Sequence, residues 1–224
     1  MPSMVDVPPR KDALVNLFIT LYAVSEASRR GVVDGRVKLM KLLQKAEEEL
    51  TKKNMRGPSF KFYKWKYGAW SPEAQFDHDL LTKRGLLSED KEGHVIEVTA
   101  DGRDIIDSSR HIIEKNREIM DVIDRALASH VQYKSWQLRD LTYATSVLGR
   151  ERKRMEQIKI GEVVLSPVEE EKASRFFLVD DEWLDMIAMS VSEEFRQLLE
   201  QVPEKPDLTQ YEPIASLRTE YGLQ

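Results

Sequence analysis

The sequence predicts a mainly α-helical protein with a small β wing. Apolar residues recur every three or four positions over long stretches, and glycine or proline separates these stretches. Only short segments between them are typical of strands. A chain of 224 residues suits one large domain or two small ones. It has no cysteine, which excludes disulfides, thiol nucleophiles and cysteine zinc sites.

The charge balance limits the classes of partner. The formal net charge is −5, from 34 basic and 39 acidic residues, whereas nucleic-acid binders usually carry a basic excess. The N-terminal stretch lacks the apolar core of a signal peptide, and no run approaches the roughly 20 apolar residues of a membrane span. We therefore expect a cytoplasmic protein that contacts no membrane.

Two helices are predicted at the start of the chain. The first spans residues 10–30 and ends at Gly31, and the second spans residues 35–53. Lys38, Lys41 and Lys45 share one face of the second helix, where Glu48 and Glu49 are placed to pair with them. The expected core positions are Leu14, Leu17, Phe18, Leu21 and Tyr22 in the first helix and Leu39, Met40, Leu43, Ala46 and Leu50 in the second.

A strand and a turn then lead into a third helix. Residues 60–67 are rich in aromatic residues and are typical of a short strand. Gly68 allows a sharp turn, Ser71 is a suitable N-cap, and Pro72 suits the first helical position. The helix that follows is expected to end at Gly85. Its expected buried residues are Phe76, Leu80 and Leu81.

A hairpin and a long helix complete the first predicted domain. Residues 86–87 and 94–98 form the hairpin, and Thr99 begins a long helix with Gly102 in its first turn. The helical stripe of this helix consists of Ile105, Ile106, Ser109, Ile112, Ile113, Asn116, Met120, Ile123 and Leu127. The order helix, helix, strand, helix, two-stranded wing, helix predicts a winged-helix-like domain over residues 10–129. Residues 130–202 are predicted as a helical extension and residues 203–224 as a polar, proline-containing tail.

Three helix starts are predicted within the extension. Ser135 can cap a helix that carries Trp136, Leu138, Leu141 and Leu148. Ser-Pro followed by acidic residues at 166–171 has the same pattern as the start of the third helix. Asp180 or Asp181 begins the last helix. Its expected buried residues are Trp183, Leu184, Ile187, Val191, Phe195 and Leu198.

Several stretches of the chain, taken together, resemble a known family. They are "VKLMKLLQKAEEEL", "YKWKYGAWSPEAQFDHDLLTKRGLL" and "IEVTADGRDII", and they resemble the Panacea domain, the group of SocA-like antitoxins and related phage-associated proteins. The matching residues are Lys38, Leu39, Lys41, Leu42 and Leu43; Tyr67, Gly68 and Ser71; Gly85, Leu86 and Leu87; and Thr99 and Gly102.

A later segment resembles the closing L-x-x-L-T-H motif of the same family. Leu138, Leu141 and Thr142 match, whereas Tyr143 stands where the family has histidine and Ala69 stands where it has proline. The resemblance covers roughly residues 10–148. It implies a non-enzymatic interaction module that binds another protein, either as an antitoxin to a toxin encoded beside it or as an adaptor.

Two functional hypotheses follow, and they predict different interaction residues. A protein-binding module would use exposed aromatic residues among Trp65, Tyr67 and Trp70. A DNA-binding regulator, homodimeric through the helix at 103–127, would need basic residues and would lose affinity steeply with salt. Acidic residues at the start of the third helix disfavour DNA. The candidate basic residues are Lys83, Arg84, Arg150, Arg152 and Arg154.

Nothing in the sequence assembles a catalytic, metal or cofactor site. The four histidines have no metal-ligand spacing, and neighbouring residues on a helix, such as Asp77, His78 and Asp79, diverge by about 100 degrees. There is no glycine-rich phosphate loop and no nucleophile or zinc-protease motif. We expect no enzyme and no cofactor.

Truncation of the predicted core tests the helix assignments. Leu43→Ala and Ile113→Ala are each expected to lower the free energy of unfolding by about 2–5 kcal/mol, because each leaves a cavity in a packed interior. Urea denaturation measures the change. Unaltered stability in both variants would reject the two helical stripes.

Overall fold

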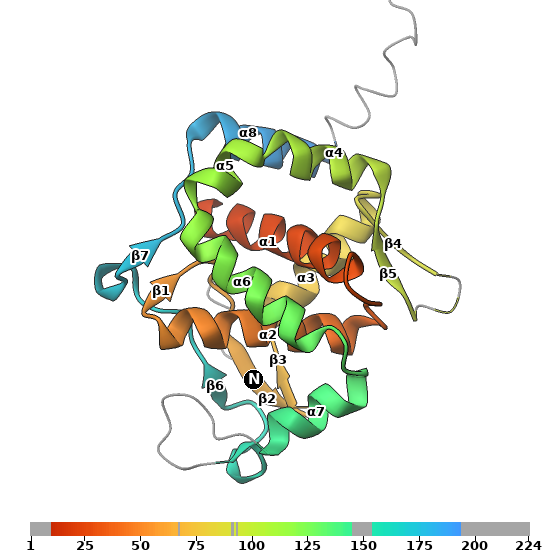
Figure 1. Ribbon diagram of the computed structural model, residues 1–224, viewed down its shortest axis with the longest axis vertical. Coiled ribbons are helices and arrows are strands. Elements are labelled where there is room, and N and C mark those ends of the chain that lie inside the picture. Colours follow the sequence, from red (N-terminus) through yellow and green to blue (C-terminus); the bar gives the residue numbers. More distant parts are fainter. Residues whose placement is uncertain (1–9, 67, 91, 93, 145–153, 194–224) are drawn as a thin grey trace, which may run out of the picture. The chain divides into compact units, whose positions relative to one another are not determined.

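The computed structural model describes residues 10–66, 68–90, 92, 94–144 and 154–193 (Figure 1). The mainly helical prediction is confirmed. The helices are α1 (Arg10–Ser28), α2 (Arg36–Lys52), α3 (Pro72–Lys83), α4 (Ala100–Ser108), α5 (Arg110–Lys115), α6 (Arg117–His130), α7 (Ser135–Ala144) and α8 (Asp181–Ser190). The strands are β1 (Met55–Arg56), β2 (Phe62–Trp65), β3 (Gly68–Trp70), β4 (Leu87–Glu89), β5 (Ile96–Val98), β6 (Val163–Leu165) and β7 (Arg175–Phe176).

Helix α1 is surrounded by other elements. It packs against α2, α3, α4, α6, α8 and β5, and Figure 1 shows it in the middle of these helices. The predicted apolar face of α1 is buried, but the opposite face is buried too, including Val15, Ile19 and Val24. A helix that is apolar on all sides belongs in the interior of a protein. The first helix is therefore the centre of the core.

The long helix predicted after Thr99 is divided into α4, α5 and α6. Thr99 caps α4 as expected, since its Oγ1 accepts a hydrogen bond from the Gly102 amide at 3.1 Å. The divisions fall at Ser109 and Asn116, the two polar residues of the stripe, which are both buried. Their side chains bond to backbone carbonyls four residues earlier and to the C-terminal part of the chain. Such bonds compete with the regular helical pattern.

The segment from Met155 to Val191 returns to the first half of the chain. Strand β6 pairs antiparallel with β2, and β7 pairs parallel with β1. In α8, the indole of Trp183 meets the Phe18 ring edge-on at 5.2 Å and donates a hydrogen bond to Ser109 Oγ at 2.9 Å. The described residues up to Val191 therefore form one compact unit. The domain boundary expected at residue 130 does not separate two packed units of the described residues.

Two predictions in this segment have different outcomes. The last helix begins as predicted, because Asp180 Oδ1 accepts a hydrogen bond from the Trp183 amide at 3.0 Å. The helix predicted at 166–171 is wrong: only the single 3-10 turn Glu170–Lys172 forms there. The segment connects strands β6 and β7, which pair with β2 and β1 respectively. Residues 203–224 lie outside the described part of the chain.

Helix α3 and the hairpin β4–β5 form where predicted, with one error in the buried face. Ser71 caps α3 by accepting a hydrogen bond from the Ala74 amide, Pro72 is its first residue, and Gly85 follows with a left-handed φ of 73°. The prediction that Phe76 is buried is wrong, because 67% of it is exposed. The buried residues of α3 are instead Ala74, Asp77, His78 and Leu81.

The β4–β5 pair is a separate two-stranded sheet, and β2 lies between β3 and β6 in another sheet. The core prediction of Leu43 is confirmed, since this residue is buried. Ile113 is only partly buried against the core. Its truncation therefore removes fewer contacts than the sequence predicted, and we expect its loss of stability at the lower end of the range.

Burial of Glu47 makes stability depend on pH. This side chain on α2 is fully buried, and neither carboxylate oxygen has a hydrogen-bond partner among the described residues. Burial raises the pKa of Glu47 well above its ordinary value, although Arg56 acts in the opposite direction. The folded chain thus binds more protons than the unfolded chain between the two pKa values. Its stability falls as the pH rises through this window.

Glu47→Gln is expected to remove this pH dependence. At pH 8 the variant should be more stable than the parent protein, and the difference should shrink as the pH falls to the ordinary glutamate pKa of 4.5 and below, where Glu47 of the unfolded chain also becomes protonated. Urea unfolding across this range measures it, with Glu49→Gln as the control because Glu49 is partly exposed beside Lys52. Parallel curves for Glu47→Gln and the parent would contradict the assignment.

Candidate functional site

Two tryptophans meet on the β2–β3 hairpin. In the antiparallel register, Trp65 lies opposite Gly68 and Trp70 lies opposite Tyr63. The rings of Trp65 and Trp70 are 5.8 Å apart between centroids, and 49% of Trp65 is exposed. Because strands that pair directly bring such side chains together, the hairpin alone builds an aromatic pair at the surface.

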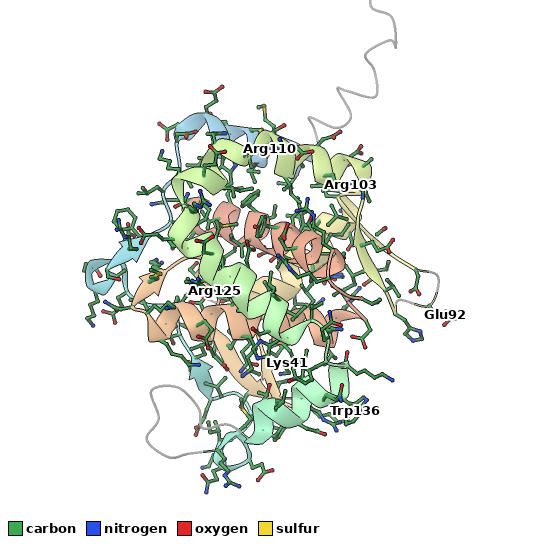
Figure 2. All side chains as sticks on the ribbon, viewed as in Figure 1. Lys41, Glu92, Arg103, Arg110, Arg125 and Trp136 are labelled. Atoms are coloured by element: carbon green, nitrogen blue, oxygen red, sulfur yellow. The ribbon has the colours of Figure 1, made fainter. Side chains whose placement is uncertain are left out.

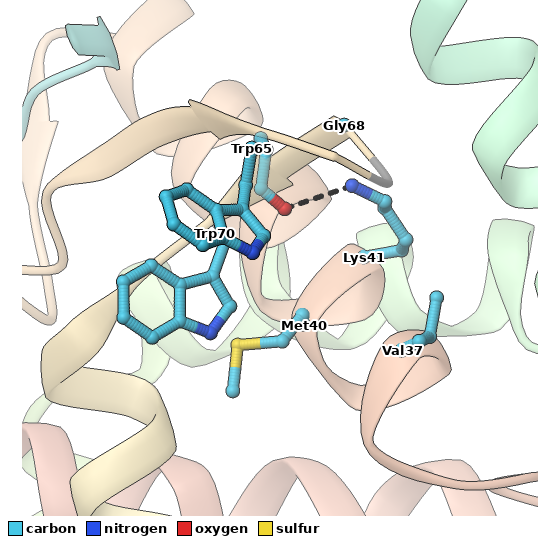
Figure 3. Close-up of a pocket in the computed structure, with 7 residues that line it drawn as sticks. Val37, Met40, Lys41, Trp65, Gly68 and Trp70 are labelled. Atoms are coloured by element: carbon cyan, nitrogen blue, oxygen red, sulfur yellow. Dashed lines mark hydrogen bonds between the residues drawn. The ribbon is translucent and has the colours of Figure 1, made fainter. Parts of the chain in front are cut away.

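A small cavity lies between this pair and helix α2. Val37 and Met40 from the first turns of α2 line it together with Trp65, Trp70 and Lys41 (Figure 3). The cavity has a volume of about 60 Å³. Pockets for cofactors and other small molecules are usually about 300–1,000 Å³, so this cavity suits a single side chain instead.

Lys41 is almost completely buried beside this cavity. Only 1% of the residue is exposed, and its Nζ donates a hydrogen bond to the backbone carbonyl of Ala69 at 2.8 Å (Figure 3). Burial, together with the positive charges of Lys45 and Lys64, lowers the pKa of Lys41 to about 7, although Glu48 acts in the opposite direction. A large fraction of this amine is therefore neutral at physiological pH.

Gly68 permits the close approach of the hairpin to Lys41. Its φ is +99°, a left-handed conformation that favours glycine. A Cβ at this position would lie 2.7 Å from Lys41 Nζ and 3.5 Å from Cε2 of Tyr143. A side chain would thus displace the amine from the Ala69 carbonyl.

A second lysine is held by helix α7. Lys64 Nζ donates a hydrogen bond to the Tyr143 hydroxyl at 2.7 Å and lies 4.0 Å from the centre of the Tyr143 ring. The Tyr143 hydroxyl in turn donates to the Lys66 carbonyl at 3.1 Å. This tyrosine, which replaces the histidine of the resembled motif, therefore ties α7 to the β2–β3 hairpin.

The apolar surface continues onto α7. Val37 also lines a neighbouring hollow with Ser135, Trp136 and Arg139, so the two hollows adjoin. Trp136 is 55% exposed, and Figure 2 shows it on α7, the helix below Lys41 in that view. Ser135 does not cap the helix with its side chain as expected; its hydroxyl donates to Asp34 Oδ1 at 2.8 Å and fixes α7 to the start of α2. We call Val37, Met40, Trp65, Trp70 and Trp136 the tryptophan face.

Of the predicted interaction residues, the structure brings only Trp65 and Trp70 together. Lys83 is exposed near the end of α3, and Arg84 Nε donates to the Val191 carbonyl at 2.7 Å, so Arg84 ties α3 to the end of α8. Arg154 is exposed before the 3-10 turn Met155–Gln157. The other three candidates lie outside the described residues; they are Tyr67, Arg150 and Arg152.

The residues predicted to form structural motifs all support turns, helix caps or close approaches of the backbone. Besides the turn at Gly68 and the capping by Ser71 and Pro72, Thr99 Oγ1 donates to the Gly85 carbonyl at 2.7 Å and so joins the ends of α3 and β5. A Cβ on Gly102 would lie 2.3 Å from the Leu86 carbonyl oxygen, so only glycine fits there.

The polar residues at the exposed side of α3 are bonded within the chain. The amide of Gln75, the residue best suited to a base edge, donates to both carboxylate oxygens of Asp79 at 3.0 and 2.9 Å. Asp79 also pairs with Arg36 at 3.0 Å. His78 is completely buried, with Nδ1 3.3 Å from Asp79, and Asp77 is buried nearby with a raised pKa caused by burial.

No group of three or more metal-ligating side chains occurs in the described part of the chain. Sequence reasoning missed Lys41, Lys64, Val37 and Trp136 as members of the site. A signal was available for the lysines, because Lys38, Lys41 and Lys45 alternate with the apolar core positions of α2. Long basic side chains in such positions can bury their stems.

Comparisons with known proteins place this chain in no group. No family model, no curated protein sequence and no solved structure matches it. Among the helices of the described residues, none is both long enough and apolar enough to cross a membrane.

Replacement of Gly68 tests the packing of the hairpin on Lys41. Gly68→Ala and Gly85→Ala each force alanine into a left-handed conformation, which costs about 1–2 kcal/mol. Gly85 has no atom within 4 Å of its Cβ position, so Gly85→Ala is the matched control. Gly68→Ala should lose about 1–3 kcal/mol more, because it also breaks the buried hydrogen bond of Lys41. Equal losses in urea denaturation would contradict this packing.

Proposed function

We propose that this chain is a non-enzymatic regulatory module that binds another protein through the tryptophan face, in the manner of an antitoxin or an adaptor. The observation that carries the proposal is the half-exposed Trp65, paired with Trp70 above a small apolar cavity. Tryptophan is enriched in protein interfaces and especially among the residues that dominate their binding energy. Trp136 and Val37, both exposed, extend the face to α7.

The residues that resemble the Panacea family support this proposal by their positions. Lys41 matches the first resembling motif and Gly68 the second, whereas Tyr143 occupies the position in the closing motif where the family has histidine. A Cβ on Gly68 would touch both Lys41 and Tyr143, so three segments far apart in sequence meet behind the tryptophan face. A shared interaction site would explain why the resemblance is concentrated in these segments.

A DNA-binding regulator with a winged-helix-like domain is the second candidate. The succession of α2, the β2–β3 hairpin, α3, the β4–β5 hairpin and α4 favours it, because α3 then occupies the position of a recognition helix. The charges of α3 oppose it, since Glu73 and Asp79 would repel phosphate and Gln75 is already bonded to Asp79. The tryptophan face has no role in that candidate.

Copurification from native lysate, with and without nuclease, tests the proposed function. The tagged protein should retain one stoichiometric protein after nuclease treatment. Trp65→Ala should weaken its binding by more than about tenfold, because a large buried anchor is removed from the interface. The matched control is Phe76→Ala, which removes an exposed aromatic side chain from α3 instead.

Two outcomes would contradict the proposal. A partner retained equally by the Trp65→Ala protein would exclude the tryptophan face as the interface. Recovery of DNA that depends on Lys83 or Arg154, with protein partners lost after nuclease treatment, would favour the regulator instead.

A further inference from the structure

Two buried lysines, Lys41 at the cavity and Lys64 on strand β2, donate to neutral acceptors among the described residues. Lys38 lies 3.6 Å from Asp34, and Lys45 lies 2.7 Å from Glu48. In contrast, within the described residues the amines of Lys41 and Lys64 have no carboxylate within 4 Å; they donate to the Ala69 carbonyl and the Tyr143 hydroxyl. Both side chains are at least nine-tenths buried. A positive charge on either amine therefore has no carboxylate in contact with it in the described part of the chain.

The groups around Lys41 would favour the entry of an anion. On α2, Lys45 lowers the pKa of Lys41 and Glu48 raises it, while Lys64 on β2 lowers it; Tyr143 on α7 contributes a neutral hydroxyl nearby. A carboxylate at the Lys41 amine would balance these charges and would draw a proton onto Lys41 when it binds. An apolar ligand would neither balance these charges nor draw a proton onto Lys41.

The cavity adds a requirement for an apolar group. Val37, Met40, Trp65 and Trp70 supply most of its walls, and Lys41 lies at its edge (Figure 3). A ligand that uses both features must carry a small apolar group and an anionic group a few ångströms apart. In a polypeptide this combination arises wherever Asp or Glu stands close to an aliphatic or aromatic residue.

We propose that the segment which docks on the tryptophan face is an acidic peptide of a partner protein, with one apolar side chain in the cavity and a neighbouring carboxylate on the amine of Lys41. This inference rests on the proposed function and names the chemistry of its partner. An acidic segment is complementary in charge to the protonated lysines, so we assign the site to an acidic peptide. A single-stranded nucleic acid is also anionic and stacks on tryptophan, but it needs a continuous basic track for its phosphates, whereas this site offers a small cavity and two buried lysines.

Selection from a phage-displayed library of random peptides tests the inference. The full-length protein should enrich peptides in which Asp or Glu stands near Leu, Ile, Met or Phe. The Lys41→Met protein should retain the apolar preference and lose the acidic one; it should also fold, because replacing a buried charge by an apolar side chain of similar size is often neutral or stabilising. The Trp65→Ala protein should enrich neither.

The outcomes separate the two proposals. Apolar peptides without acidic residues, selected by the parent protein and lost in Trp65→Ala, would overturn the acidic segment and leave the interaction function standing. No selection by the parent protein, or equal selection by Trp65→Ala, would contradict both. Binding of a fluorescent single-stranded oligonucleotide that is lost in Trp65→Ala would assign the face to nucleic acid and overturn the inference.

A selected peptide should also bind in a pH-dependent manner. Because the free Lys41 has a pKa of about 7 and the bound lysine would be protonated, affinity should weaken about tenfold from pH 6 to pH 8. Fluorescence anisotropy of the labelled peptide measures this change. The same peptide with Asn or Gln in place of its acidic residues is the control and should bind weakly and without this pH dependence. Identical pH profiles for the two peptides would overturn the contact with Lys41.

Discussion

The need to cover α1 on every side organises the described part of this protein. A helix with apolar residues around its whole circumference cannot stand at a surface, so it must be enclosed by other elements. The helices nearest in sequence leave one side open, and the segment from Met155 to Val191 returns to close it. Trp183 then packs on Phe18 and bonds to Ser109, which joins the last helix to both the centre of the core and the α4–α5 junction.

The packing that encloses α1 also explains why charged side chains of α2 are buried. One side of α2 packs on α1 and α6, and the other lies under the β2–β3 hairpin and α7, so lysines on that side are covered as well. Buried ammonium groups without carboxylate partners destabilise a fold. Lys41 and Lys64 keep this arrangement through a carbonyl and a phenol. Folding does not require these buried lysines, and their burial lowers stability. This arrangement fits a binding site in which a ligand supplies the missing negative charge.

Local patterns were sufficient to predict some elements and insufficient for others. The caps at Ser71, Thr99 and Asp180 and the glycines at 68, 85 and 102 could be located because their signals lie within a few residues. The breaks at Ser109 and Asn116 could not, because they depend on Trp183 and Leu178, more than sixty residues away. Phe76 was misplaced because the buried face of α3 includes the polar residues Asp77 and His78, so apolar periodicity did not mark the side that packs against α1.

The candidate site was predictable only in part for the same reason. Trp65 and Trp70 were found from their aromatic character and their place on one hairpin, but Lys41, Val37 and Trp136 join them through contacts between α2, β3 and α7. The most direct test of the whole account is a structure of the protein with its captured partner. We expect an apolar side chain of the partner in the cavity between the Trp65–Trp70 pair and α2, and a carboxylate on Lys41. An unoccupied tryptophan face, with the partner seated on α3, would contradict the account.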